Sequence, residues 1–419
     1  MKQRVRELIK DVVIVVLAVS LAVLTVLSLP AQSIQRSPFL SSLLKPVASL
    51  LGLEQAELAY LEVKEPVMDA AQPQAISVNT ATGRYTAIWD FTALDNAFET
   101  LGGALGQALD TAQTPEVSSR SDLRTALQGE SVYFSYDLRL PAAVLASWLD
   151  AAPEVELPQV DACALVIEGE EVALYLVGAT VQKAATGLSA ETLSPLLSQF
   201  RPDGSAFAFE TTATVDAFSL LPTGTPALPD AQLSSPCDSR FTEALATALG
   251  FNPYGDTIYT DAAGVTSFTE AGCALEAAPD GEIRLTVTVD DRFRAADETE
   301  EALVEEARRL VTLTAGESAG AARLYLTGVT RNDEGETTCT FDYYLSGVKV
   351  TLSTGHAAEV TFVGQSVRSM TVRALTFTTT GSTLPVMPVA QAAAVLAPGK
   401  RLVLSYQLQG DTLQAGWVS

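Results

Sequence analysis

The longest uninterrupted apolar segment of the chain lies near its start, at residues 12–29. Its 18 positions are almost all Val, Leu, Ile and Ala, and none carries a charge. A helix that spans a bilayer needs about 17–25 such residues. Four basic residues precede the segment: Lys2, Arg4, Arg6 and Lys10. Because the more basic flank stays in the cytoplasm, we predict a cytoplasmic tail at 1–11, a transmembrane anchor at 12–29 and an extracytoplasmic location for the bulk of the chain.

A cleaved signal peptide is the alternative interpretation of this segment. The apolar region of a signal peptide is about 7–15 residues long, so the run is too long for one, and Ala31 and Ser33 make a poor cleavage site. We therefore expect a single-pass anchor in the cytoplasmic membrane. One of its faces carries small residues at helical spacing, namely Ala18, Ala22 and Thr25. Small residues let helices approach closely in lipid, so this stripe is a candidate transmembrane interface, although an Ala-rich composition alone would also produce it.

Prolines divide the rest of the chain into segments. Residues 30–72 contain several prolines, which interrupt any continuous helix, and we interpret them as a stalk. A second proline-rich segment, at 222–236, is the strongest boundary signal in the chain. These boundaries predict an N-terminal ectodomain at 73–221, a linker at 222–236 and a C-terminal ectodomain at 237–419.

Within both predicted ectodomains, apolar positions recur with the periods of helices and strands. Residues 94–108 place apolar side chains at helical spacing, whereas 132–138 alternate as in a half-buried strand. Another helix follows Asp297, which together with Glu300 suggests a capping box. The recurring unit is a helix followed by antiparallel strands. We therefore predict an α+β fold of two, or at most three, domains, with helices packed on one face of antiparallel sheets.

Charge and composition narrow the possible partners. The chain carries 26 Lys and Arg against 50 Asp and Glu, a formal net charge of −24. Nucleic acid selects basic surfaces, so we expect no nucleic-acid partner. One histidine and four scattered cysteines are too few for a zinc site of three or four converging ligands. We therefore expect neither a metal nor a cofactor.

The four cysteines are far apart in the sequence, at Cys163, Cys237, Cys273 and Cys339. Outside the cell they are permitted to form two disulfides, with three possible connectivities. Cys163 lies in an apolar run that indicates a buried strand. Because a domain of this size does not need disulfides and cysteine packs as a small hydrophobe, we expect free, buried thiols.

One short motif suggests catalysis. The segment Gly316-Glu317-Ser318-Ala319-Gly320 matches the G-x-S-x-G nucleophile elbow of esterases, and the only histidine, His356, follows it with Asp333 or Asp342 in between. The elbow requires a strand before the serine and a helix after it, whereas this sequence predicts the reverse. We therefore interpret Gly316 as the C-terminal cap of a helix and His356 as a turn residue, and we expect no catalytic residue.

Residues 237–419 also carry apolar and glycine patterns that resemble those of a known family. The patterns are Phe341-Asp342-Tyr343-Tyr344-Leu345-Ser346-Gly347-Val348, Ala357-Ala358-Glu359-Val360, Pro385 followed by Gln391-Ala392-Ala393, Leu404-Ser405-Tyr406, and Leu413 followed by Trp417. They resemble the extracytoplasmic part of the YycH/YycI family, whose terminal domains are similar to PepSY-type modules. A single N-terminal anchor with a large ectodomain also matches that family.

The resemblance implies a function that neither composition nor spacing predicts. Members of the family are non-enzymatic accessory proteins that restrain or tune a sensor histidine kinase in cell-wall homeostasis, through anchor helices and ectodomain pairing, so the expected partner is a membrane sensor kinase or a homologous accessory protein. The resemblance assigns no binding or catalytic residue to this chain, because the family has no catalytic signature to align. Two other functions stay open: a surface module that binds the wall or a ligand without signalling, and a secreted hydrolase that uses Ser318.

Overall fold

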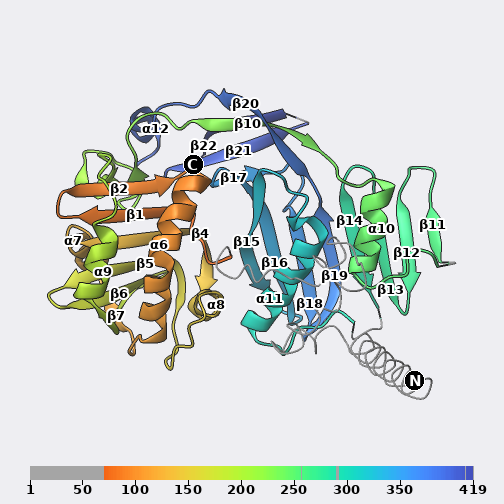
Figure 1. Cartoon of the computed structure of the whole chain (residues 1–419), viewed down its shortest axis with the longest axis horizontal. Helices are drawn as coiled ribbons and strands as arrows, with labels where there is room; N and C mark the ends of the chain where they lie inside the picture. The colour runs from red at the N-terminus through yellow and green to blue at the C-terminus, as the bar shows by residue number, and fades with distance from the viewer. Residues whose placement is uncertain (1–69, 256, 289–291, 411, 419) are drawn as a thin grey trace, which may run out of the picture. The chain divides into compact units, whose positions relative to one another are not determined.

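The structure is a computed structural model, and it describes residues 70–419 except residues 256, 289–291, 411 and 419 (Figure 1). The described residues belong to one compact unit. The predicted tail, the anchor and most of the stalk lie outside the described residues, as do Ala18, Ala22 and Thr25. Of the helices in the described part, none is both long and apolar enough to cross a bilayer.

The α+β prediction is confirmed for this part of the chain. Seven α-helices accompany two large sheets and two short two-stranded ribbons. In the described part, the strands pair antiparallel except for β17 (Val348–Thr351) and β21 (Val403–Gln409), which pair parallel. The fold thus lacks the repeated crossover helices of a parallel sheet.

The first large sheet has seven strands in the order β2-β1-β4-β5-β6-β7-β3. Its strands are β1 (Ala75–Thr80), β2 (Gly83–Ile88), β3 (Glu116–Ser118), β4 (Ser131–Pro141), β5 (Gln159–Glu168), β6 (Glu171–Val177) and β7 (Val181–Ser189). Four helices belong to it: α6 (Phe91–Asp110), α7 (Arg120–Ala126), α8 (Ala142–Trp148) and α9 (Ala190–Leu197). The strand predicted at 132–138 and the helix predicted at 94–108 are β4 and α6.

Alternation along β4 explains how the helices are distributed over the two faces. Phe134 belongs to the large core cluster that includes residues of α6, α8 and α9. Its neighbour Tyr133 points to the other face, where it packs with Leu123 of α7 and with Phe207. That second face is also covered by β8 (Ala206–Phe207), the short helix η1 (Ala208–Glu210) and β9 (Leu220–Leu221). The prediction that helices pack on one face is therefore wrong for α7.

The second large sheet has eleven strands in the order β11-β12-β13-β14-β19-β18-β16-β17-β21-β22, with β15 also paired to β16. Besides β17 and β21, its strands are β11 (Ile258–Thr260), β12 (Thr266–Glu270), β13 (Cys273–Ala277), β14 (Glu282–Val287), β15 (Ala322–Arg331), β16 (Glu336–Leu345), β18 (Ala358–Val363), β19 (Ser366–Arg373) and β22 (Thr412–Val418). Helices α10 (Ser239–Ala248) and α11 (Glu300–Val311) contribute apolar residues to the same core cluster as its inward-facing side chains.

Strand β10 (Leu228–Ser234) lies inside the proline-rich segment 222–236 and pairs antiparallel with β20 (Thr376–Leu384). Pro229 lies beside a register shift in this ribbon, where a missing backbone N–H is tolerated. The segment interpreted as a linker thus contains regular structure, and the division into two ectodomains stays a prediction. Helix α12 (Val389–Val395) follows β20.

Two local predictions are corrected by the structure. The apolar pattern of residues 367–377 predicts a single strand, whereas the structure has two, β19 and β20, because the chain turns after Arg373 and the Ala374 N–H donates to the carbonyl of Gly281. The N-cap of α11 is Thr299, which accepts from the Ala302 N–H, and not Asp297. The Asp297 carboxylate instead accepts from the Thr299 N–H at 2.8 Å, so it orders the residue that caps the helix.

Candidate functional site

The surroundings of Ser318 differ from those of a nucleophile elbow. Helix α11 and its continuation η2 (Thr312–Gly316) come before the serine, and β15 begins after it at Ala322. The Ser318 hydroxyl donates to the carbonyl oxygen of Ala315 at 3.1 Å. This is the order of elements expected from the sequence, and it is the reverse of the strand–serine–helix order that the elbow requires.

His356 and Asp342, in contrast, lie together. Asp342 is on β16 with a side chain only 4% exposed, and its carboxylate contacts His356 Nδ1 at 2.9 Å and Lys349 Nζ at 2.7 Å. It also accepts from the Thr327 hydroxyl at 2.8 Å and from the Ala357 N–H at 3.2 Å. The turn residue expected at 356 thus has a specific partner on a neighbouring strand.

The carboxylate of Asp342 is held in its ionised form. Burial opposes ionisation, but the hydrogen bonds and charge of Lys349, with His356 and Thr327, lower its pKa below the ordinary value. These four contacts come from hydrogen-bond donors or a cation, which is what a buried anion needs. Within the described residues, no hydrogen bond joins Ser318 to His356. The formal Ser–Asp–His order is therefore realised only in its Asp–His half.

A second polar cluster connects the two large sheets, and we call it the inter-sheet joint: Gln72, Asp95, Arg323 and Tyr325. Arg323 on β15 donates to both carboxylate oxygens of Asp95 on α6, each at 2.7 Å. The Gln72 amide oxygen accepts from Arg323 at 2.9 Å and from the Tyr325 hydroxyl at 2.7 Å, and its amide nitrogen donates to Asp95 at 2.7 Å. Gln72 is buried at 4% exposure. The Gln72 side chain thus contacts all three other members of the inter-sheet joint.

Aromatic packing and electrostatics reinforce the joint. The Arg323 guanidinium lies 4.2 Å from the centre of the Phe91 ring, a cation–π geometry. Tyr325 packs edge-on against Tyr344 with ring centroids 5.2 Å apart. The hydrogen bonds from Arg323 lower the pKa of Asp95, and those of Asp95 raise the pKa of Arg323. The pair is therefore charged on both sides at neutral pH.

A tight turn of the eleven-stranded sheet makes a further contact with the seven-stranded sheet. Ser346 and Gly347 both have positive φ, as in a two-residue hairpin turn. The Ser346 hydroxyl donates to the carbonyl of Trp89 at 3.0 Å, and a Cβ on Gly347 would come within 2.9 Å of Leu94. The glycine therefore permits the close approach of the two elements as well as the turn.

Beside this turn lies a small crevice of about 50 Å³, lined by residues of both sheets that include Ser135, Asp137 and Lys349. Arg401 crosses it, donating to the Ser135 hydroxyl at 3.0 Å and lying 3.5 Å from Asp137. Small-molecule sites usually measure about 300–1,000 Å³. This crevice has space for only a few water molecules, so it is part of the contact between the sheets and not a ligand pocket.

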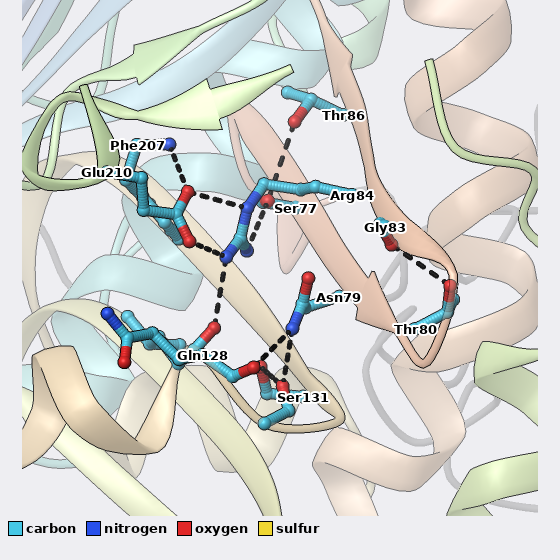
Figure 2. A network of polar contacts seen from close by, with 12 residues as sticks. Ser77, Asn79, Thr80, Gly83, Arg84, Thr86, Gln128, Ser131, Phe207 and Glu210 are labelled. Carbon is cyan, nitrogen blue, oxygen red and sulfur yellow. Dashed lines mark hydrogen bonds and ion pairs between the residues drawn. The ribbon is translucent and has the colours of Figure 1, made fainter. Parts of the chain in front are cut away.

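The most buried ion pair described lies within the seven-stranded sheet and is structural (Figure 2). Arg84, whose side chain is 4% exposed, donates to Glu210 at 2.7 and 3.2 Å and to the carbonyl of Leu127 at 3.0 Å. The other Glu210 contact is the Phe207 N–H, at 2.8 Å. Because these partners come from β2, η1 and the end of α7, the network fixes the cover of the second face of the sheet.

Cys163, Cys237 and Cys339 are free thiols, as expected, and three of the four cysteines are buried. Burial raises the pKa of Cys163 and of Cys339 to about 12 in each case. The thiolate is the reactive form of cysteine, so these two side chains are packing groups. Among the residues that the structure describes, no three His, Cys, Asp or Glu side chains gather in a way that would hold a metal ion.

Comparison with protein-family models, with curated proteins and with solved structures finds no match for this chain. The resemblance to the YycH/YycI family therefore stays a prediction. Sequence reasoning missed the inter-sheet joint, since its members are polar residues far apart in the chain. The one local signal was Arg323, a basic residue in an otherwise apolar strand pattern.

Proposed function

We propose that the chain is a non-enzymatic, membrane-anchored accessory protein that regulates an envelope two-component signalling complex by protein–protein contact. In this proposal residues 12–29 anchor it in the cytoplasmic membrane, the N-terminus is inside, and the folded part is extracytoplasmic. The partner is a membrane sensor kinase or a homologous accessory protein. The Lys/Arg asymmetry around the apolar segment supports the placement, and the family resemblance supports the role.

The observation that carries the proposal is the position of Gln72. It is the last residue of the segment that we interpret as a stalk, and it is buried between α6 and β15, bonded to Asp95, Arg323 and Tyr325. Next to it, the carbonyl of Ala71 accepts from the buried Tyr136 hydroxyl at 3.1 Å. A displacement of the stalk would therefore act directly on the contact between the two sheets, as a protein that relays or restrains movement at a membrane requires.

A surface module that binds the wall without signalling is the alternative, and one feature favours it. On the face of the eleven-stranded sheet away from α11, hydroxyl residues lie opposite one another on five strands in the order Thr330, Thr338, Thr361, Ser369 and Thr286. The hydroxyls of Thr338 and Thr361 are 3.1 Å apart. Such a row offers hydrogen bonds to a polysaccharide, although threonine pairs also stabilise sheets without any ligand.

Crosslinking in intact membranes, followed by purification of the full-length chain, tests the proposal against this alternative. The proposal predicts enrichment of a sensor histidine kinase or of a homologous accessory protein. The alternative predicts retention on purified, protein-free cell wall, with weaker retention after Thr338→Val and Thr361→Val than after Thr378→Val on β20. Wall retention without any kinase or accessory protein would refute the signalling role.

A further inference from the structure

The eleven-stranded sheet ends at β11, and among the described residues β11 pairs only with β12 (Figure 1). The Asp261 N–H donates to the carbonyl of Val265, and the Thr269 N–H donates to the carbonyl of Thr257. In an antiparallel pair, positions that bond to the neighbouring strand alternate with positions that point away from it. Ile258 and Thr260 therefore direct their N–H and C=O groups to the free edge of the sheet.

Apart from its length of three residues, this edge lacks the usual protection against a further strand. Natural edges carry Lys, Pro or inward-pointing charges, whereas β11 reads Ile-Tyr-Thr. Two large aromatic side chains are exposed beside it, Tyr259 at 67% and Tyr254 at 82%. The inward side chain of Ile258 packs against the core, so the strand is held in place from one side.

The surroundings of the edge are acidic. Residues 241–283 contain seven Asp and Glu and neither Lys nor Arg. Arg292, in the flanking segment, pairs with Glu270. Arg284, on β14, pairs with Glu282. Asp261 and Asp280 are both exposed, and they lie on turns in contact, since a Cβ on Gly264 would be 3.0 Å from Pro279. Two exposed carboxylates therefore lie near the C-terminal end of β11.

We propose that the free edge of β11 binds an extended, basic polypeptide segment, which joins the eleven-stranded sheet as a further strand. The main-chain groups of Ile258 and Thr260 supply hydrogen bonds, as in other cases of strand addition. The carboxylates attract lysine or arginine side chains, and the exposed tyrosine rings provide cation–π contacts. A second copy of this chain is disfavoured as the occupant, because two β11 edges would bring like charges together. This inference goes beyond the proposed function, since it holds whether or not the protein regulates a kinase.

Fluorescence anisotropy with the full-length protein in detergent micelles tests the inference. The probe is a labelled peptide of alternating lysine and threonine, and the comparison peptide alternates glutamate and threonine. We expect the lysine peptide to bind, more weakly as salt is added, and the glutamate peptide not to bind. Failure of the lysine peptide to bind, or equal binding of both peptides, would overturn the proposal.

Variants locate the binding at this edge. Thr260→Pro removes an outward N–H and the hydroxyl contact with Thr266 but keeps the main-chain bonds to β12, so we expect about tenfold weaker binding. Tyr259→Ser should weaken it about threefold, and Asp261→Asn, which keeps the turn acceptor but removes the charge, about twofold. Val117→Ser is the matched control, because Val117 is 83% exposed on the edge strand β3 of the other sheet.

Thermal unfolding of each variant shows whether it is folded. If Thr260→Pro does not fold, Tyr259→Ser and Asp261→Asn decide the matter. Unchanged binding in these variants, or an equal loss in Val117→Ser, would place the peptide elsewhere. Dimerisation of the wild type without peptide, abolished by Thr260→Pro, would identify a second copy as the occupant and would also overturn the proposal.

Discussion

Arg323 on β15 and Asp95 on α6 form two parallel hydrogen bonds of 2.7 Å, although 228 positions separate them in the chain. A bidentate pair fixes the orientation of its two groups as well as their distance. Because Gln72 bonds to both partners, the last residue of the predicted stalk is part of this link. The contact between the two large sheets is thereby tied to the N-terminal end of the described chain.

A double-mutant cycle with Arg323→Ala and Asp95→Ala measures the strength of the pair. We expect a coupling of about 1 kcal/mol in the free energy of unfolding, at the upper end for partly exposed pairs because the geometry is bidentate. Arg139 and Asp161, 3.6 Å apart and similarly exposed, form the control pair. Their coupling should be about 0.3 kcal/mol. Equal couplings by urea unfolding would show that the joint has no special strength.

The pH dependence of stability follows from the lowered pKa of Asp95. Its pKa in the folded state lies below its unfolded value of about 3.9, so the stabilisation is complete above that value. It is lost as the pH falls through the folded pKa. The difference in unfolding free energy between wild type and Asp95→Asn should thus be constant near neutrality and shrink below about pH 4. A difference that grows on acidification would contradict the assignment.

Removal of Glu210 should be costly, because it leaves the buried Arg84 without its carboxylate. We expect Glu210→Ala to lower the free energy of unfolding by about 3 kcal/mol. The control is Glu168→Ala, since Glu168 pairs with Lys183 where both side chains are more than a third exposed. That change should cost about 0.5 kcal/mol. Similar losses for the two variants in urea unfolding would mean that burial of Arg84 is not what sets the cost.

Ser318 should be inert towards serine-directed reagents. Its hydroxyl donates to the Ala315 carbonyl, and the elements around it run in the order helix, serine, strand. A nucleophilic serine needs a base within hydrogen-bond reach. We therefore expect no labelling of the wild type by a phosphonate probe and no change of function in Ser318→Ala. Labelling that disappears in this variant would instead identify a serine hydrolase.

Local patterns were sufficient for the elements whose periodicity is strong. The apolar spacing of 94–108 and the alternation of 132–138 correspond to α6 and β4. The patterns failed where pairing with a distant strand determines the local structure. The prolines of 222–236 suggested a linker and concealed β10, which exists because β20 lies beside it. The break between β19 and β20 could not be predicted, because apolar alternation continues through Ala374. The chain changes its partner strands there, since β19 pairs with β14 and β18 and β20 pairs with β10.

The candidate sites were harder to predict than the fold, for a physical reason. Gln72 and Asp95 each occupy a position that is unremarkable in its own segment, and only the folded chain brings them to Arg323. His356 was expected in a turn, and it does lie between β17 and β18, but the sequence left Asp333 and Asp342 open as its acidic partner, and only the structure shows the bond to Asp342. The reversed context of Ser318, in contrast, was predictable because it depends on adjacent elements alone.

The most direct test of an anchored regulatory protein is crosslinking to the partner helix in native membranes. Replacing Ala18 and Ala22 with Leu should hold a partner helix further away, at a cost of about 1–2 kcal/mol if an interhelical hydrogen bond is also lost. The matched control replaces Val19 and Val23 with Leu, on faces expected to contact lipid. At equal abundance in the membrane, we predict that the Ala variant loses crosslinking to a sensor kinase or accessory protein and that the Val variant keeps it. Equal crosslinking by the two variants would contradict a regulatory interface in the anchor.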